Sequence, residues 1–338
     1  MYTNKKISIP IIKPLDDLKL PLSINYIGCA GFEDRATSSL DYMKMNNINI
    51  NKAICIKYKP FNRKNRVKIL KNKVENLGGK IKWCFYNRYD PENFEQILPT
   101  LLNWNEIDNI VVDISGMSKM LIMILLHNLK MIYKNILYVL YSEAEIYHPT
   151  LQEYNKEMKN SIPKMSIPIF LTSEIYKIIT TPSLSSVSMQ GYPILLITYP
   201  TFNYLELITL HIEISPQKMI LIEGEPLNTK DKWRLNAIKE INKTFIDSSD
   251  VNSESCVLTT FDHIPNLQYL QELYKKYRYT HKILLSPTGS KLQTIACHIF
   301  KQLYPEIQIV YPVTKAFIGE YSEGCRRLWG LDLSSFLN

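Results

Sequence analysis

The 338-residue sequence predicts an α/β protein built from two tandem Rossmann-like units, each a mainly parallel sheet flanked by helices. Apolar runs of strand length alternate with amphipathic helical segments, which is the pattern of βαβ units whose strands are buried on both faces. The same order of elements then recurs at an offset of about 170 residues. Because order and spacing are kept together, we interpret the two halves as an internal duplication.

The first unit is expected to alternate strands and helices from residue 23 onward. Strands are predicted at residues 23–28, 52–58, 80–87, 109–115 and 135–143. Helices are predicted to begin near Thr37 and to cover residues 62–79, 93–103 and 117–131. In the helix at 62–79 an apolar stripe recurs at helical spacing and Gly78-Gly79 is a typical stop.

The second unit repeats this order from residue 193. A Pro-apolar-Asn turn follows the second strand in both units, at residues 60–62 and 226–228. We expect an N-terminal extension at 1–22, a first unit at 23–151, a connector at 152–192 and a second unit at 193–338. Within the connector, the segment IFLTSEIYKII (169–179) is interpreted as a short helix.

The composition is that of a globular protein, with 46% hydrophobic and 21% charged residues. No apolar stretch reaches the roughly 18–20 residues that a membrane-spanning helix needs, and the N-terminus does not resemble a secretion signal. The 6 cysteines are scattered, without the spacing of a zinc site or of a disulfide framework. We therefore expect a cytoplasmic protein with no metal site and no membrane contact.

The formal net charge of +8 is concentrated in the first half of the chain. The segment from Lys52 to Lys82 is rich in lysine and arginine and contains one acidic residue, Glu75. Such a segment favours anionic partners, either nucleotides or nucleic acid. The alternative is a solvated helix face in a lysine-rich protein.

Candidate ligand-binding residues lie in the loops that follow the predicted strands. In a parallel α/β sheet, ligands collect at the carboxyl ends of the strands, beside helix N-termini that favour anions. The loops DISGMSK and SPTGSK each follow an apolar strand, carry a glycine and end in Ser-Lys at the start of a helix. The glycine would let the backbone approach a ligand, the serine would donate to phosphate or ribose, and the lysine would supply a charge.

The binding candidates come from three loops. They are Gly28, Gly31 and Arg35 after the first strand; Asp113, Ser115, Gly116, Ser118 and Lys119 in the first Ser-Lys loop; and Ser286, Thr288, Gly289, Ser290 and Lys291 in the second. The alternative for each Ser-Lys loop is a capped helix whose serine serves only the backbone. In the GCAGFEDR loop, Glu33 and Asp34 would equally complement a helix dipole.

No catalytic constellation is legible, and catalytic residues are left unassigned. His127 and His298 fall within predicted helices, where a packing role is favoured, and Cys29 is interpreted as a small buried thiol. Carboxylates that follow predicted strands are weak acid–base candidates: Glu143, Glu145, Glu320 and Glu323.

The two Ser-Lys loops, at 113–119 and 286–291, resemble the signature loop of CARF domains, which sense cyclic oligonucleotides in CRISPR-associated immunity. Two such units in one chain are similar to the SAVED arrangement of related antiphage systems, and the likeness in architecture covers roughly residues 23–330. The resemblance implies a nucleotide-sensing subunit of a bacterial defence complex that acts through a partner effector. It places the ligand between the paired loops, with Ser118, Lys119, Ser290 and Lys291 on its phosphates.

Two other functions remain open from the sequence. One is an enzyme, such as a phosphodiesterase or a nuclease component, that uses the same cleft. The other is a scaffold whose Rossmann-like units bind only protein. Turnover of a cyclic oligonucleotide would distinguish the enzyme from the sensor.

Overall fold

The computed structural model describes residues 9–102, 104, 109–132, 137–161, 163, 166–248, 252–317 and 321–337. The helices and strands up to residue 161 are β1 (Lys13–Pro14), η1 (Leu15–Asp17), β2 (Ser23–Cys29), η2 (Asp34–Thr37), α1 (Ser38–Met45), β3 (Asn49–Lys59), α2 (Val67–Asn76), β4 (Lys80–Asn87), α3 (Glu92–Leu101), β5 (Ile110–Asp113), α4 (Lys119–Ile132), β6 (Leu137–Glu143), β7 (Ile146–Tyr147) and α5 (Leu151–Ser161).

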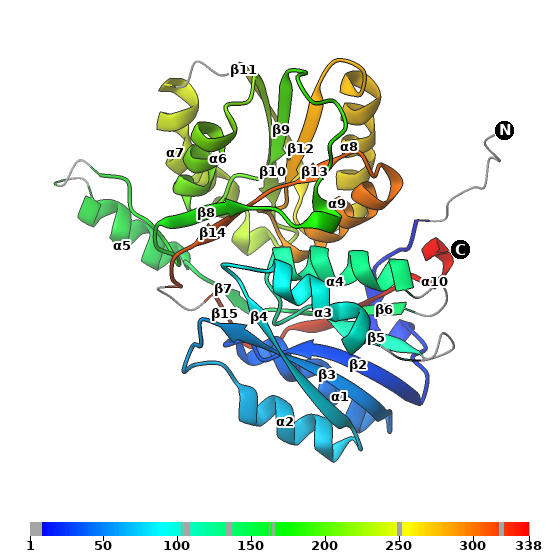
Figure 1. The fold of residues 1–338 in the computed structure, drawn as a ribbon. Helices are drawn as coiled ribbons and strands as arrows, with labels where there is room; N and C mark the ends of the chain where they lie inside the picture. Colours follow the sequence, from blue (N-terminus) through cyan, green and yellow to red (C-terminus); the bar gives the residue numbers. More distant parts are fainter. Residues whose placement is uncertain are drawn as a thin grey trace. The chain divides into compact units, whose positions relative to one another are not determined.

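The elements after residue 166 are β8 (Ile175–Ile179), η4 (Pro182–Leu184), β9 (Ile194–Thr198), α6 (Tyr204–Ile214), β10 (Lys218–Glu225), η5 (Thr229–Asp231), α7 (Trp233–Ser248), β11 (Asn252–Thr259), α8 (His263–Tyr277), β12 (Lys282–Ser286), α9 (Lys291–Leu303), β13 (Gln308–Ile309), β14 (Tyr311–Thr314), β15 (Ser322–Glu323), β16 (Arg327–Asp332) and α10 (Ser334–Leu337). Figure 1 shows their course along the chain.

The first sheet has the order β1-β16-β6-β5-β2-β3-β4. Strands β2 to β6 run parallel, and their registers place the carboxyl ends of β2, β5 and β6 at one edge. Strands β2, β5 and β6 are buried along nearly their whole length because both of their faces are covered. Leu40 and Leu70, from α1 and α2, pack on one face against Tyr26 and Cys55, and α3 and α4 lie on the other face (Figure 1).

The second sheet repeats this order. Its strands are arranged β11-β10-β9-β12-β13, which matches β4-β3-β2-β5-β6 position by position, and every pairing in both sets is parallel. Helices α6 and α7 contribute Leu207, Leu210 and Phe245 to the core on one face. The expected fold class, mainly parallel sheets flanked by helices in two halves of the chain, is confirmed.

The boundaries of the two compact units differ from the expected ones. The first unit contains Met1–Leu121, Leu125–Ile146 and Ser322–Asn338, and the second contains Ile122–Ile124 and Tyr147–Tyr321. The expected second unit, 193–338, therefore ends too late. Strand β16 returns to the first sheet and pairs antiparallel with β6 and β1, because β6 would otherwise leave an unpaired edge there.

The segment 169–179 is not a helix, contrary to the prediction. Its residues 175–179 form strand β8, which pairs antiparallel with β14 of the second unit. The β-branched isoleucines of EIYKII suit an extended strand once a partner is present. The connector and the second unit are thus joined through β8. In the described part of the chain, no helix is long and apolar enough to cross a membrane.

Candidate functional site

In the first unit, the loops that follow β2 and β5 are in backbone contact. A Cβ on Gly31 would lie 3.1 Å from the Cα of Gly116, and a Cβ on Gly116 would lie 2.7 Å from the carbonyl oxygen of Cys29. A side chain on Gly28 would overlap the ring of Tyr26. The glycines predicted to admit a ligand therefore first serve to bring protein segments together.

Arg35 is held in a buried network rather than presented at the surface. The guanidinium donates from Nε to Ser322 Oγ (2.9 Å), from Nη1 to the Ser142 carbonyl (2.6 Å) and from Nη2 to Glu33 Oε1 (3.0 Å). The Ser322 hydroxyl also donates to Glu33. Both charged side chains are nearly inaccessible, with 5% of Arg35 and 9% of Glu33 exposed.

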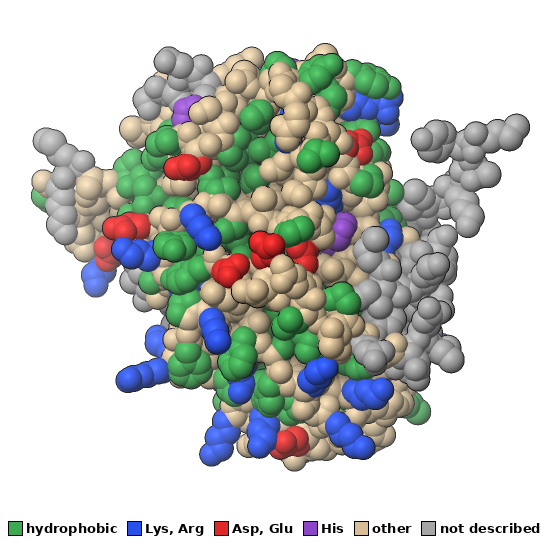
Figure 2. Space-filling model, in the orientation of Figure 1, with side chains coloured by type: hydrophobic (Ala, Val, Ile, Leu, Met, Phe, Trp, Pro, Cys, Tyr) green, Lys and Arg blue, Asp and Glu red, His purple; other side chains and the backbone are tan. Residues whose placement is uncertain are grey.

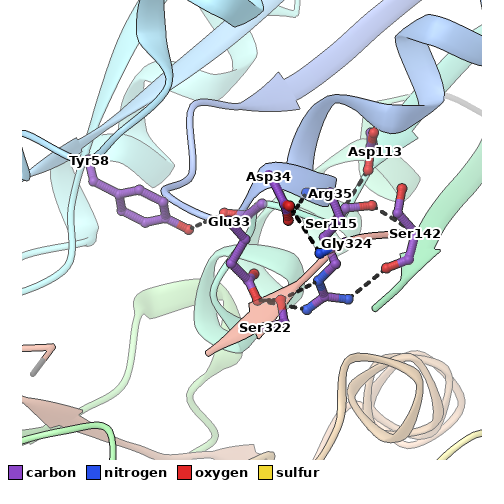
Figure 3. Close-up of polar contacts among 10 residues, drawn as sticks. Glu33, Asp34, Arg35, Tyr58, Asp113, Ser115, Ser142, Ser322 and Gly324 are labelled. Carbon is purple, nitrogen blue, oxygen red and sulfur yellow. Dashed lines mark hydrogen bonds and ion pairs between the residues drawn. The ribbon is translucent and has the colours of Figure 1, made fainter. Parts of the chain in front are cut away.

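Figure 3 shows this network as sticks, with its hydrogen bonds as dashed lines. Asp34 completes it by accepting a hydrogen bond from the backbone N–H of Gly324 (3.0 Å). The loop after β2 therefore anchors the segment at Ser322 where the chain returns to the first unit. A buried ion pair with its hydrogen bonds satisfied is a structural anchor, and this is the role that the geometry gives Arg35.

Asp113 and Ser115, at the end of β5, are buried and engaged within the protein. Asp113 accepts from the Ser115 N–H (2.8 Å) and from the hydroxyl of Ser39. The Ser115 hydroxyl accepts from the Ser142 N–H (2.8 Å), which ties this loop to β6. These contacts fix the path of the DISGMSK loop and so set the position of the residues that follow.

Ser118 and Lys119 form the exposed end of this loop, and both side chains are partly accessible. The N–H of Ser118 donates to the hydroxyl of Tyr58 (2.6 Å), and that hydroxyl donates to the Gly116 carbonyl (3.3 Å). Burial raises the pKa of Tyr58 well above its usual value, so the phenol stays neutral and keeps the proton it donates. The Ser118 hydroxyl accepts weakly from the N–H of Leu121 (3.4 Å), as a helix cap does.

In the second unit, the SPTGSK loop is held by a different set of contacts. The Thr288 hydroxyl donates to the Tyr199 carbonyl (2.7 Å) and accepts from the Tyr199 N–H (3.2 Å). A Cβ on Gly289 would collide with the amide of Gln293 and lie 3.0 Å from the Tyr199 ring. Ser286 and Thr288 are buried, so they shape the loop from beneath.

Ser290 forms a complete capping box at the start of α9. Its hydroxyl accepts from the Gln293 N–H (3.1 Å) and donates to the Thr260 carbonyl, and the Gln293 side chain accepts from the Ser290 N–H (2.8 Å). Ser290 therefore caps helix α9, which is the alternative role that the sequence analysis gave to the serine of this loop. Lys291, the first residue of α9, is partly exposed, as Lys119 is at the start of α4.

Each of these helices begins with a lysine and has no acidic residue in its first turn. The first turn of a helix carries a partial positive charge from its unpaired N–H groups. A lysine placed there adds to that charge instead of offsetting it. Both units therefore carry a basic residue at a helix start beside the carboxyl ends of their strands, Lys119 in the first and Lys291 in the second.

Several residues of these loops were not singled out from the sequence. Tyr58 ends a strand and reads as one more buried aromatic, and only its place beside β2 brings it under the Ser118 N–H. Ser322 and Gly324 lie about 290 residues from the loop they contact, so no local pattern predicts them. The role of Gln293 could have been predicted from the sequence, because Gln three residues after Ser290 makes the Ser-x-x-Gln pattern of a capping box.

Where the structure describes them, the weaker catalytic candidates named next are buried or take part in structural contacts. Cys29 and His298 are buried, Glu143 accepts from Trp329 Nε1 (2.9 Å), and Glu320 lies outside the described residues. The carbonyl oxygen of Glu323 accepts from the N–H of Glu145 (3.1 Å). Among the described residues, no group of three or more His, Cys, Asp or Glu is arranged to hold a metal ion.

No protein-family model matches the chain, and no curated protein is similar enough in sequence to count as a match. Its fold is similar to a solved structure described as a Type III CRISPR defence DNA nuclease activated by cyclic oligoadenylate. The TM-score is 0.54 at 10% sequence identity, and the match covers 86% of this chain and 65% of that one. The chain thus spans less than two thirds of the length of the nuclease whose fold it shares.

Proposed function

We propose that this protein binds a nucleotide, of the cyclic oligonucleotide class, and acts as a sensing subunit in prokaryotic antiviral defence. In this proposal each unit offers one phosphate-binding point, at the start of α4 in the first unit and at the start of α9 in the second, and the bound state is passed to a partner effector protein. The deeper loop residues, including Arg35, Asp113 and Thr288, position the loops without touching the ligand.

The observation that carries the proposal is the repetition of one feature at the same place in two units. In each unit the strand next to the central one (β5 or β12) leads through a glycine-containing loop into a helix that begins Ser-Lys. A single Ser-Lys helix start is explained by capping alone. Two lysines at equivalent positions, each opposing the dipole of its own helix, are better explained by an anionic ligand.

The electrostatic cost of this arrangement supports the same conclusion. A cation in the first turn of a helix is unfavourable by roughly 0.3–1 kcal/mol. A bound phosphate reverses the sign of that contribution, because it accepts from the helix N–H groups and from the lysine ammonium together. The likeness in fold to a nuclease activated by cyclic oligoadenylate adds support for a nucleotide with several phosphates.

The proposal is tested by the thermal stability of the double variant Lys119→Ala/Lys291→Ala, with and without cyclic oligoadenylates. A ligand at 100 times its dissociation constant stabilises the wild-type protein by about 2.7 kcal/mol. The double variant should lose this shift, because two charged hydrogen bonds of about 1.5–3 kcal/mol each are removed. Without ligand, the variant should melt at the same temperature as the wild type or slightly higher, since an unfavourable charge is gone from each helix start.

The matched control is Lys44→Ala/Lys243→Ala, which removes the same charge from exposed lysines, one in each unit. It should keep the ligand-induced shift. If the variant Lys119→Ala/Lys291→Ala melts well below the wild type and retains the shift, the two lysines are structural and the proposal is wrong.

A further inference from the structure

Aromatic and basic side chains that are exposed or partly exposed lie on β3, on β4 and in the turn that follows β3. We call this surface the β3–β4 patch and define it by Lys57, Lys59, Phe61, Trp83 and Phe85. Phe61 is 65% exposed and Phe85 is 51% exposed. The ammonium of Lys57 lies 4.1 Å from the centre of the Trp83 ring, and that of Lys59 lies 4.5 Å from the centre of the Phe85 ring.

The parallel register places the four strand residues of the patch, Lys57, Lys59, Trp83 and Phe85, on one face of the sheet. Cys55 pairs with Trp83 and Lys57 pairs with Phe85, and neighbours in register point to the same side. Nearer the start of the strands this face is covered, since Cys55 packs with Leu70 of α2 in the core. The patch begins where that cover ends, toward the carboxyl ends of β3 and β4.

The patch is electropositive and its charges are not neutralised by nearby acids. From residue 49 to residue 89 the chain has one acidic residue, Glu75, whose carboxylate lies 3.7 Å from the ammonium of Lys71. Within the described part of the chain, no ion pair joins Lys57 or Lys59 to a carboxylate. Figure 2 shows lysine and arginine side chains gathered over the region of β3, β4 and α2, with hydrophobic side chains between them.

The second unit shows that the fold does not require these residues. At the positions of Lys57 and Lys59, strand β10 carries Glu223 and Glu225. These carboxylates pair with Lys239 (2.8 Å) and Lys232 (3.2 Å). Val257 takes the place of Phe85, and Leu227 the place of Phe61. The cationic and aromatic residues of the β3–β4 patch therefore have no counterpart at the equivalent positions of the second unit. Because the fold does not require them, we interpret them as residues that bind a ligand.

We propose that the β3–β4 patch binds single-stranded nucleic acid. Flexible single strands are held by cations that contact the phosphates and by aromatic rings on which bases stack. An exposed cation–π contact such as that of Lys59 with Phe85 is worth a factor of only about two to five, whereas one stacked base is worth about five- to more than a hundredfold. A base therefore displaces the ammonium from the ring, and the released lysine is left beside the phosphate.

This inference goes beyond the proposed sensing role, because none of its residues belongs to the Ser-Lys loops. Polyanions without bases would be held by the lysines alone, and duplexes would offer no exposed base to stack. The patch is thus expected to prefer single-stranded RNA or DNA over both. The comparison of RNA with DNA shows whether the 2′-hydroxyl contributes.

The experiment measures fluorescence anisotropy of labelled single strands of about 12 nucleotides, over a series of salt concentrations. The residues of the second unit provide the variants, since they occupy the same strand positions. Lys57→Glu/Lys59→Glu should weaken binding and reduce the magnitude of the log-affinity against log-salt slope by about 1.4, for two lost phosphate contacts. Phe61→Leu/Phe85→Val should weaken binding by about 30-fold or more and leave the slope unchanged.

One control, Lys44→Glu/Lys243→Glu, makes the same change of charge, and the other, Tyr192→Leu/Tyr279→Leu, also removes two aromatic rings; all four residues are exposed. They should bind like the wild type. The proposal is overturned if neither patch variant changes the affinity for the labelled single strand. It is also overturned if inorganic polyphosphate displaces the labelled strand as well as an unlabelled strand does and Phe61→Leu/Phe85→Val binds like the wild type. Both patch variants should keep the melting shift with cyclic oligoadenylate, so the failure of one proposal is distinguishable from the failure of the other.

Discussion

Replacing Arg35 with methionine should destabilise the first unit severely without acting on a ligand. Methionine keeps much of the apolar volume and removes the charge. Glu33, 9% exposed, is then left as a buried carboxylate without its cation, and the Ser142 carbonyl and the Ser322 hydroxyl each lose a donor. Breaking a buried pair from one side costs about 3–5 kcal/mol.

The change is large enough to follow by differential scanning calorimetry. For a domain of about 150–250 residues, 1 kcal/mol shifts the melting temperature by about 2–4 °C, so Arg35→Met should lower it by about 6–20 °C. The double variant Glu33→Gln/Arg35→Met removes both charges and should recover part of the loss. A variant Arg35→Met that melts within about 2 °C of the wild type but no longer binds nucleotide would refute the anchor and make Arg35 a ligand contact.

Three further experiments test the packing of the two units, the first two in the first unit and the third in both. Gly116→Ala should destabilise it by roughly 1–3 kcal/mol in chemical denaturation, because the new Cβ would lie 2.7 Å from a backbone oxygen; an unchanged midpoint would mean that the two loops separate freely. Tyr58→Phe leaves a partly buried N–H without its acceptor, which should cost about 1–3 kcal/mol and also lower nucleotide affinity if the loop must be held in place. Burial raises the pKa of the thiols of Cys55, Cys84 and Cys297 to about 12. In the folded protein these thiols should therefore not react with a thiol reagent at pH 8, whereas in denaturant all three should react. Rapid labelling of these cysteines in the native protein would contradict their burial.

Much of the fold was predictable because its central strands are buried on both faces. A strand such as β5 has no polar face, so it appears in the sequence as a continuous apolar run. Strand β4 is buried at alternate positions instead, and it spans the predicted residues 80–87. The repeat then fixes the strand order of one unit by analogy with the other. Strand β16 was missed because its partner β6 lies almost 190 residues earlier in the chain, and local patterns carry no information on such pairing.

The candidate site was predictable only in part. The Ser-Lys turns are visible because a glycine, a cap and a helix start follow one another in the sequence. The contacts that hold these turns are not visible, since Arg35 finds its partners at Ser142 and Ser322 only after folding. Sequence reasoning therefore placed Arg35 and Lys119 in one class of candidate ligand contact, whereas the structure buries the first and leaves the second partly exposed.

The most direct test of the central claim is a calorimetric titration of the purified protein with cyclic oligoadenylates of several ring sizes. Linear oligoadenylates of the same length serve as the comparison. The account predicts saturable binding of at least one ring, tighter than its linear counterpart, with a loss on the order of a hundredfold or more in Lys119→Ala/Lys291→Ala. Absence of binding for every ring, or equal affinity in the wild type and the double variant, would contradict it.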